Sequence, residues 1–487
     1  MTKTDKTTEQ NKKILSLKMI WLAVILILGL NNIQAASVDT KGVGEVLLFP
    51  YYTVNNDINT SYALVNTSNQ AKSIKVRFLE GDNNIEVLVF NVYLSPFDVW
   101  VGTLSPTIST IAGHIGEPSV LHSTDDNSCA PYLNKAAQEF LPFAIDNQDL
   151  LSVSQGNNSM ERSTEGHIEV IEMGVVVGDS ADAISHDANG IPNNCSQLED
   201  AWGSGKPYWS IDPMQDLEPA SGGLMGSATL LNINQGTAVS YDALAIDDFW
   251  ATDAETHTEP GTLVPNLAQI DTETNVIFGD QTINSSWLSG HESISALLMQ
   301  KSLFNQYDLF SFINASTEWV VSFPTKIFHT NNQIIGTFIP PFSSSWNGLE
   351  ACETVSTTVW DNSQLSNAPA PLDLCQAVNV IEFKNPSEPA NTTSAILGST
   401  NLVTSNSVNL NQAGQSGWMK LDLSANNQRM VDDNAFTYNG LPAMGFMVNR
   451  YTNAGAPVGV LAQYSGLYMH TTQKSIQPDI IFKSTFE

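Results

Sequence analysis

Four residues with oxygen ligands lie close together in one loop of the sequence, and their chemistry suits a calcium ion. They are Asp179, Asp182, Asp187 and Asn189, and Gly190 follows them. Calcium prefers carboxylate and carbonyl oxygens on a flexible segment. The spacing differs from that of an EF-hand loop, so a solvated acidic loop is the competing interpretation. Calcium is the only candidate cofactor that the sequence indicates.

Three aromatic residues form a second candidate site. Trp202, Tyr208 and Trp209 flank a Gly-Ser-Gly-Lys-Pro turn. Exposed rings at such a turn can stack on sugars, so the segment is a candidate ligand-binding site for a polysaccharide. Buried aromatic rings at such a turn would instead pack the loop onto a sheet. The sequence leaves both interpretations open.

The sequence carries no local signature of catalysis. The GxSxG nucleophile elbow, the HExxH zinc motif and the phosphate-binding P-loop are all missing. His291-Glu292 is followed by Ser-Ile-Ser, without a second histidine one helical turn later. A glycosidase pair of carboxylates is defined by a distance in space, which a sequence does not contain. We therefore predict no catalytic residues and keep a hydrolase with a loop-assembled site as an alternative.

Four cysteines are present, at Cys129, Cys195, Cys352 and Cys375. Their spacing does not fit a zinc site, because there is no CxxC pair. An even number of cysteines in an exported chain predicts two disulfides. Three pairings are possible. We prefer Cys129–Cys195 with Cys352–Cys375, because each pair falls in its own Asn/Pro-rich region.

Residues 1–35 have the pattern of a signal peptide. Met1–Lys18 carries five lysines, Met19–Leu30 is an uncharged apolar run of 12 residues, and Ala35 and Ala36 are the small residues of a cleavage site. The apolar run is shorter than the roughly 20 residues of a comfortable membrane span. An uncleaved anchor is the alternative. We expect export, cleavage near Ala35 and no integral membrane span after cleavage.

The charge of the chain limits its partners. The formal net charge is −30 at pH 7. Such a charge repels nucleic acid and anionic lipid headgroups, so neither is an expected partner. The candidate partners are a cell-surface component, a polysaccharide or further copies of the chain. The expected location is secreted, periplasmic or at the cell surface.

These candidate sites need a scaffold, and the stretch from Gly44 to Leu104 indicates its class. It contains five short β-type runs, separated by clusters of Asn, Asp, Gly and Pro that favour turns. The runs are Glu45–Val54, Ser61–Asn66, Ser73–Leu79, Ile85–Leu94 and Val99–Leu104. Strands of this length, about 10 residues apart, predict an antiparallel β-sandwich of immunoglobulin-like type.

The run Ser73–Leu79 alternates between apolar and polar residues. This period of two predicts a half-buried strand. We expect one face to lie in the core and the other in water, where substitutions change stability by no more than about 0.5 kcal/mol. The core set is Ile74, Val76 and Phe78, and the solvent set is Ser73, Lys75 and Arg77.

The opening block resembles the start of an uncharacterised family of secreted or surface-associated bacterial β-rich proteins. Further matching stretches are GGLMGSATLLNINQGTAVSYDALA from Gly222, STEWVVSFPTKIF from Ser316 and GVLAQYSGLYMH from Gly459. Together they span nearly the whole mature chain. The family has no assigned activity, cofactor or catalytic residue. The resemblance therefore implies a secreted, β-rich protein and no particular chemistry.

The remaining chain is too long for one core, so we expect further β-rich regions. The predicted organisation is a signal peptide at 1–35, a β-sandwich at 36–105, a β-rich region with long disulfide-pinned loops at 106–345, and a C-terminal β-rich region at 346–487. We expect an exported structural or binding protein without catalysis, acting at or outside the cell surface. A carbohydrate-binding module is the other alternative to this function.

Overall fold

The computed structural model describes residues 35–142, 158–203, 208–252, 254–331, 338–363, 366, 368–384, 391–403, 415–453, 455, 457, 460 and 462–478. The chain divides into a unit from Met1 to Ala35 and a compact unit from Ala36 to Glu487. The predicted signal peptide lies outside the described residues, apart from Ala35. Within the described part of the chain, no helix has the length and apolar character needed to cross a membrane.

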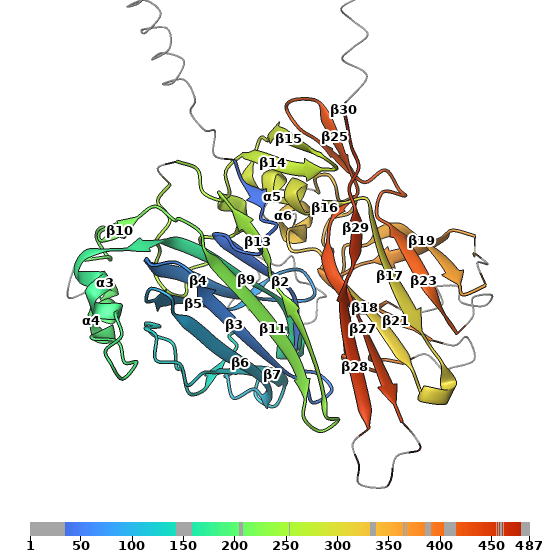
Figure 1. Ribbon diagram of the computed structural model, residues 1–487, viewed down its shortest axis with the longest axis horizontal. Coiled ribbons are helices and arrows are strands. Elements are labelled where there is room, and N and C mark those ends of the chain that lie inside the picture. The colour runs from blue at the N-terminus through green and yellow to red at the C-terminus, as the bar shows by residue number, and fades with distance from the viewer. Residues whose placement is uncertain are drawn as a thin grey trace, which may run out of the picture. The chain divides into compact units, whose positions relative to one another are not determined.

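The first half of the compact unit is a sandwich of two antiparallel sheets (Figure 1). In one sheet the strand order is β1 (Ser37–Val38), β13 (Leu244–Asp247), β2 (Val46–Thr53), β9 (Glu165–Val176), β4 (Ala71–Glu80) and β5 (Glu86–Leu94), and β10 (Leu217–Glu218) pairs with β9. In the other sheet the order is β12 (Thr237–Asp242), β11 (Leu224–Asn232), β3 (Asn59–Asn66), β6 (Val99–Ile108), β7 (Pro118–Ser123) and β8 (Gln138–Glu139). Residue 105 lies inside β6, and both sheets take strands from each side of it. The sandwich therefore extends beyond the 36–105 block.

The second half is another sandwich. One sheet has the order β20 (Ala370–Leu374), β19 (Glu353–Asp361), β23 (Ser416–Asp422), β17 (Ser302–Asp308) and β29 (Thr471–Gln473). The other has the order β22 (Leu402–Val403), β21 (Val378–Phe383), β18 (Ser316–Ser322), β27 (Met444–Thr452) and β28 (Gln463–Met469), in which only β21 and β22 run parallel. The prediction of a mostly β, antiparallel fold is confirmed. The immunoglobulin-like type stays a prediction.

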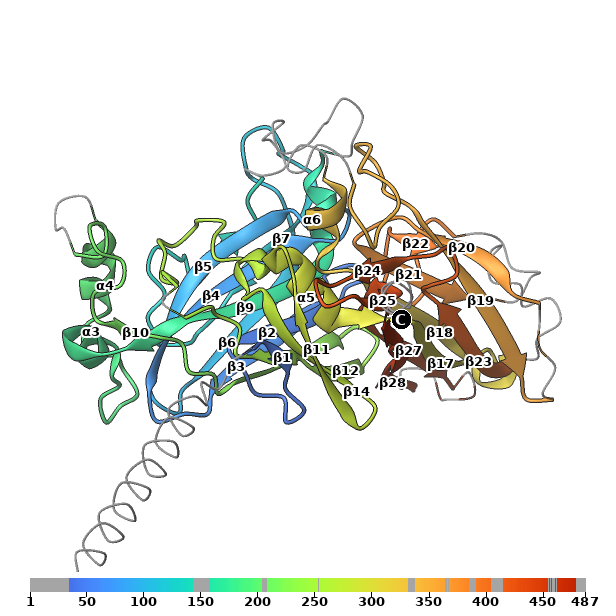
Figure 2. The same cartoon turned by 90° about the horizontal axis from the view of Figure 1, so that it is seen from above.

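Short elements join the two sandwiches. They are the pair β14 (Glu273–Phe278) and β15 (Gln281–Ser286), the pair β16 (Met299–Gln300) and β26 (Leu441–Pro442), and the three strands β24 (Arg429–Val431), β25 (Phe436–Asn439) and β30 (Ile476–Pro478). The helices are α3 (Gly178–Ile184), α4 (Cys195–Trp202), α5 (Gly290–Leu298) and α6 (Lys326–Thr330), with single 3-10 turns at Met160–Thr164, Leu267–Gln269 and Ser311–Ile313. Figures 1 and 2 both show α5 and β14 between the two sets of strands.

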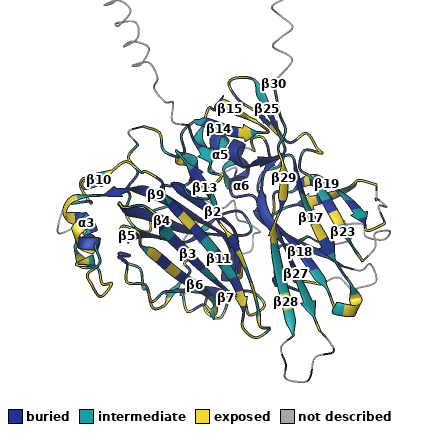
Figure 3. Ribbon diagram, viewed as in Figure 1, coloured by how far each residue is buried: buried dark blue, intermediate teal, exposed yellow. Residues whose placement is uncertain are grey.

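In the sheet that contains β18 and β27, strand β21, residues 317–322 of β18 and the first six residues of β27 are buried on both faces, as Figure 3 shows for β18. One face contributes Trp319 and Met447 to the core of the second sandwich. The opposite face contributes Val320 and Phe446 to the core of the first sandwich. The two sandwiches therefore share an apolar core and are not separate globular domains.

Strand β4 corrects the interpretation of Ser73–Leu79 as half-buried. All ten residues of β4 are buried, and the apolar set packs in the sandwich core as predicted. The prediction that Ser73, Lys75 and Arg77 face solvent is wrong, because they are 0%, 0% and 1% exposed.

A loop from far along the chain explains this burial. Lys75 Nζ donates to Glu259 O at 2.9 Å and to Thr262 Oγ1 at 3.0 Å, and Asn91 Nδ2 donates to Thr258 O at 2.8 Å. Antiparallel sheets often leave one face in water, which is what the alternating pattern suggested. Here the outer face is covered by a segment whose sequence carries no sign of that role.

Both predicted disulfides are confirmed. Cys129 is bonded to Cys195, and Cys352 is bonded to Cys375. The first bond ties α4 to the segment that follows β7, and the second ties the start of β19 to the end of β20.

Candidate functional site

The four candidate calcium ligands lie on one short segment. Asp179 and Asp182 are on α3, and Asp187 and Asn189 are in the turn that follows it. Asp187 Oδ1 accepts hydrogen bonds from the backbone N–H groups of Asn189 at 2.8 Å and Ile191 at 3.0 Å, and these bonds lower the pKa of Asp187. The Asp187 carboxylate therefore stabilises the turn in which Asp187 lies. Within the described residues, the three aspartates do not form a group whose carboxylate oxygens all lie within 4.8 Å of one another.

The three candidate aromatic residues are packed against the first sandwich. Trp202 and Trp209 are buried, and Tyr208 is half-buried. The Trp209 ring stacks on Tyr93 with a centroid distance of 5.3 Å, and Trp202 Nε1 donates to the Tyr93 hydroxyl at 3.2 Å. His257 contacts the same rings. The two tryptophans therefore fix the α4 loop on β5, and their faces are closed to a sugar.

Buried charges along β4 and β9 form the most conspicuous set of ionisable groups that the sequence analysis missed. Lys72 Nζ lies 2.7 Å from Glu172 Oε1, and Arg77 bridges Glu169 and Glu86. Each of these carboxylates has a cationic partner, which offsets part of the cost of removing it from water. These carboxylates are therefore structural. The sequence contained the charged residues themselves, with Lys72, Lys75 and Arg77 in β4 and Glu169 and Glu172 in β9.

A serine and a histidine also meet in the described residues. Ser295 Oγ lies 2.7 Å from His329 Nε2 and donates to Thr325 Oγ1 at 2.8 Å. Both side chains have no exposed surface, and burial lowers the pKa of His329 to about 3. A nucleophile needs open space beside it for a substrate atom. This pair has none, so it does not support the hydrolase alternative.

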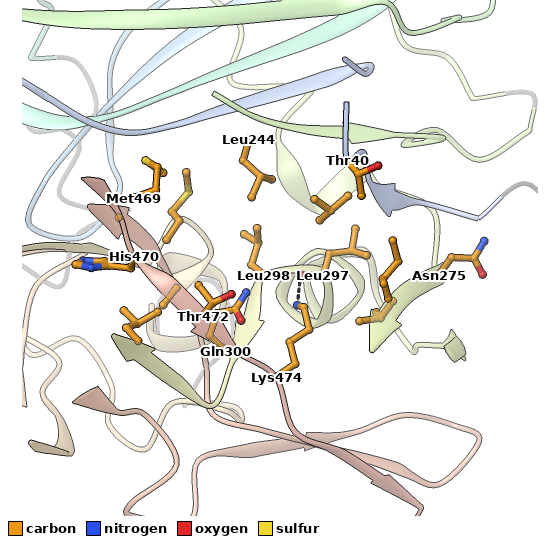
Figure 4. Close-up of a pocket in the computed structure, with 17 residues that line it drawn as sticks. Thr40, Leu244, Asn275, Leu297, Leu298, Gln300, Met469, His470, Thr472 and Lys474 are labelled. Atoms are coloured by element: carbon orange, nitrogen blue, oxygen red, sulfur yellow. Dashed lines mark hydrogen bonds between the residues drawn. The ribbon is translucent and has the colours of Figure 1, made fainter. Parts of the chain in front are cut away.

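A cavity of about 330 Å³ lies where the two sandwiches meet the joining elements, and we call it the junction pocket. Its wall takes residues from β13, β14, α5, β16, β17, β27 and β28. Most of the wall is apolar. Figure 4 shows Leu244 and Leu298 facing one another across the space, and Met469 lies on the wall beside them. Binding sites for small molecules commonly have volumes of about 300–1,000 Å³ and walls of this kind.

One charged side chain, Lys474, lines the pocket. Its Nζ donates to Leu297 O at 2.8 Å and to Met299 O at 2.9 Å, at the C-terminal end of α5. A cation is favourable at this end of a helix dipole. Desolvation by the surrounding protein lowers the pKa of Lys474 to about 8, and no other cause contributes to the shift.

Two other polar residues of the pocket, His470 and Gln300, differ in their hydrogen bonding. His470 Nε2 donates to Val320 O at 2.9 Å, and its Nδ1 lies 3.2 Å from Asn305 Nδ2. Burial lowers the pKa of His470 to about 4, so the ring is neutral at pH 7. Gln300 is only 9% exposed, and its buried Oε1 has no hydrogen-bond partner. It is one of several buried polar atoms without a partner among the described residues, and a hydrogen-bond donor would satisfy it.

The sequence contained no local signal for this pocket. Its lining residues are spread from Val38 to Lys474, and each belongs to an ordinary strand or helix pattern.

No family model matches the chain, and no curated protein is similar to it.

A second exposed feature lies on the outer face of the sheet that contains β23. Trp360 and Trp418 stack with a centroid distance of 4.0 Å and an interplanar angle of 8°, and Phe304 lies 6.3 Å from Trp418 on the next strand. Trp418 is 41% exposed. Beside these rings, Lys420 Nζ lies 2.9 Å from Asp422 Oδ2, so this pair adds no net charge.

Proposed function

We propose that the protein is exported and acts by binding, without catalysis, at or outside the cell surface, and that its ligand is a small apolar molecule held in the junction pocket. The observation that carries the proposal is the pocket itself, an apolar cavity bounded by both sandwiches. The two disulfides suit an oxidising compartment. The leader at 1–35 supplies the route of export.

The pocket would gain its affinity from the apolar surface that the ligand covers. Ile277 and Met469 are 49% and 45% exposed at its wall. Each Å² of apolar surface removed from water contributes about 25 cal/mol before the costs of association. A ligand that fills the cavity therefore gains most of its binding energy from its hydrocarbon part.

A tryptophan at position 277 tests this proposal. We expect Ile277→Trp to weaken binding of a neutral fluorescent probe, N-phenyl-naphthylamine, by about tenfold or more, because the indole occupies the pocket wall. Fluorescence titration of the full chain measures this. The matched control is Ile233→Trp, since Ile233 is also an exposed isoleucine, at 66%, and does not line the pocket. Equal binding by the two variants, or no binding by the unmodified protein, would count against the pocket as a ligand site.

A second candidate function is polysaccharide binding at Trp418. The carbohydrate alternative requires an exposed aromatic ring, and the face of β19, β23 and β17 offers Trp418 beside an ion pair that adds no net charge. A neutral polysaccharide fits best, because a chain with net charge −30 repels an acidic one. We expect Trp418→Ala to weaken retention on an insoluble neutral polysaccharide about tenfold, since losing one stacked ring costs on the order of 1 kcal/mol or more. Phe97→Ala, at a 67% exposed residue outside this face, is the control. Unchanged retention of Trp418→Ala would remove this candidate.

A further inference from the structure

We propose that the ligand of the junction pocket is an aliphatic monocarboxylate, whose carboxylate binds Lys474 beside Gln300 and whose hydrocarbon chain lies against the apolar wall. This inference rests on the proposed function and names the ligand class for the same pocket. It follows from three features of the polar end of the pocket.

The first feature is an unused donor. A lysine ammonium group has three N–H donors. Two of them point to Leu297 O and Met299 O. The third remains for a ligand, and Figure 4 shows the Lys474 side chain reaching from the pocket wall to the end of α5. A charge-assisted hydrogen bond from this group to a carboxylate is about twice as strong as a neutral one.

The second feature is an uncompensated charge. Two of the buried cations described above, Lys72 and Arg77, pair with carboxylates, whereas Lys75 has backbone carbonyls and a hydroxyl as partners. Lys474 has only backbone carbonyls, and desolvation alone lowers the pKa of its ammonium group. A bound anion would supply the missing opposite charge.

The third feature is the amide of Gln300. Gln300 and Lys474 both line the pocket, and Lys474 Nζ donates to the carbonyl of Met299, the residue before Gln300. Backbone pairing keeps the two segments together, because Lys301 N donates to Gln473 O at 2.7 Å. A side-chain amide offers one donor group and one acceptor. Together with the ammonium group it can hold both oxygens of one carboxylate.

The charge of the pocket wall favours a ligand with a single negative charge. Among the described residues, the pocket wall offers one cation, Lys474, and one other titratable group, His470, which is neutral at pH 7. A phosphate carries nearly two charges and three acceptor oxygens. It would leave part of its charge unpaired among leucine and methionine side chains, and this is unfavourable. An aliphatic carboxylate matches both the single cation and the apolar wall.

Isothermal titration of the full chain with dodecanoate and with 1-dodecanol tests the inference, since the two probes share a chain and differ in charge. We expect dodecanoate to bind about tenfold or more tightly than 1-dodecanol at about pH 7. We expect Lys474→Met to abolish that difference and Lys474→Arg to keep it. Thermal melts show whether each variant is folded.

The pH dependence of binding provides a measurement that needs no variant. Lys474 is protonated below a pKa of about 8. Raising the pH above this value removes the charge, so dodecanoate should lose the advantage of about tenfold or more that the charge provides, while 1-dodecanol affinity stays constant. His470 titrates far below this range and does not contribute.

The outcomes distinguish the carboxylate inference from the proposed function on which it rests. Equal affinity for both probes, or a preference that survives Lys474→Met and high pH, would overturn the carboxylate inference and leave the pocket as an apolar site. Failure of both probes to bind would overturn the proposed function itself. If Lys474→Met does not fold, Lys474→Arg and the pH series on the unmodified protein decide.

Discussion

Replacing Arg77 by methionine will lower the free energy of unfolding by about 3–5 kcal/mol. The guanidinium group donates to Glu169 through Nη1 and to Glu86 through Nη2. Arg77 and Glu169 are each 1% exposed. Removing the cation leaves the Glu169 carboxylate buried, with His167 Nε2 at 3.3 Å from its Oε1, and leaves the partly exposed Glu86 carboxylate without its cation. Urea unfolding, followed by circular dichroism, measures the loss.

Two comparisons make this result specific to a buried charge. Lys420→Met breaks the Lys420–Asp422 pair, whose side chains are 28% and 25% exposed, and should cost no more than about 1 kcal/mol. Adding Glu169→Gln and Glu86→Gln to Arg77→Met should recover part of the loss, because the stranded charges disappear. A cost below about 0.5 kcal/mol for Arg77→Met would instead restore the exposed-strand interpretation of β4.

Replacing Phe446 by alanine will cost about 3–5 kcal/mol and will weaken both sandwiches together. Phe446 has no exposed surface. Its ring centroid lies 5.2 Å from that of Tyr241 and 6.2 Å from that of Tyr51, both in the first sandwich. The substitution therefore opens a cavity between the two sandwiches. Urea unfolding combined with amide hydrogen exchange in β2 and β9 measures the effect.

Phe383→Ala is the matched control for this prediction. Phe383 is also a buried phenylalanine, but it lies only in the core of the second sandwich. Both variants should lose stability, and Phe446→Ala should increase exchange in β2 and β9 more strongly. If the first sandwich kept its full protection in Phe446→Ala, the two sandwiches would be energetically independent and the shared core would contribute little.

Strand β4 shows how a correct strand prediction can still be wrong about what packs against the strand. The alternation of Ile74, Val76 and Phe78 depends only on the period of a β-strand, so it identified the face that lies in the sandwich core. Whether the opposite face meets water depends on what else packs there. The loop near Glu259 covers it, and that loop lies more than 180 positions along the chain from Lys75. No local pattern in β4 contains that information.

The aromatic residues show the same limit. Trp202 and Trp209 stood next to turn-forming residues, and this left a sugar-binding surface open as an alternative to the commoner packed plug. The stacking of Trp209 on Tyr93 brings together residues from α4's loop and from β5. The exposed Trp418 stacks on the half-buried Trp360, its cross-strand neighbour 58 positions away. Exposure of an aromatic ring is a tertiary property, and only the sheet order assigns it.

The sequence by itself determined the features that depend on local periodicity and composition. These are the mostly β architecture, the strands of the opening block, and the pairing Cys129–Cys195 with Cys352–Cys375, which followed from an even cysteine count and regional composition. The tertiary structure alone decided that two sandwiches share a core through Phe446, and that Lys474 and Gln300 meet in one pocket. The physical reason is that cavities and buried charges arise where distant segments exclude water together. Their free energy belongs to the assembled contacts and is absent from any single stretch of the chain.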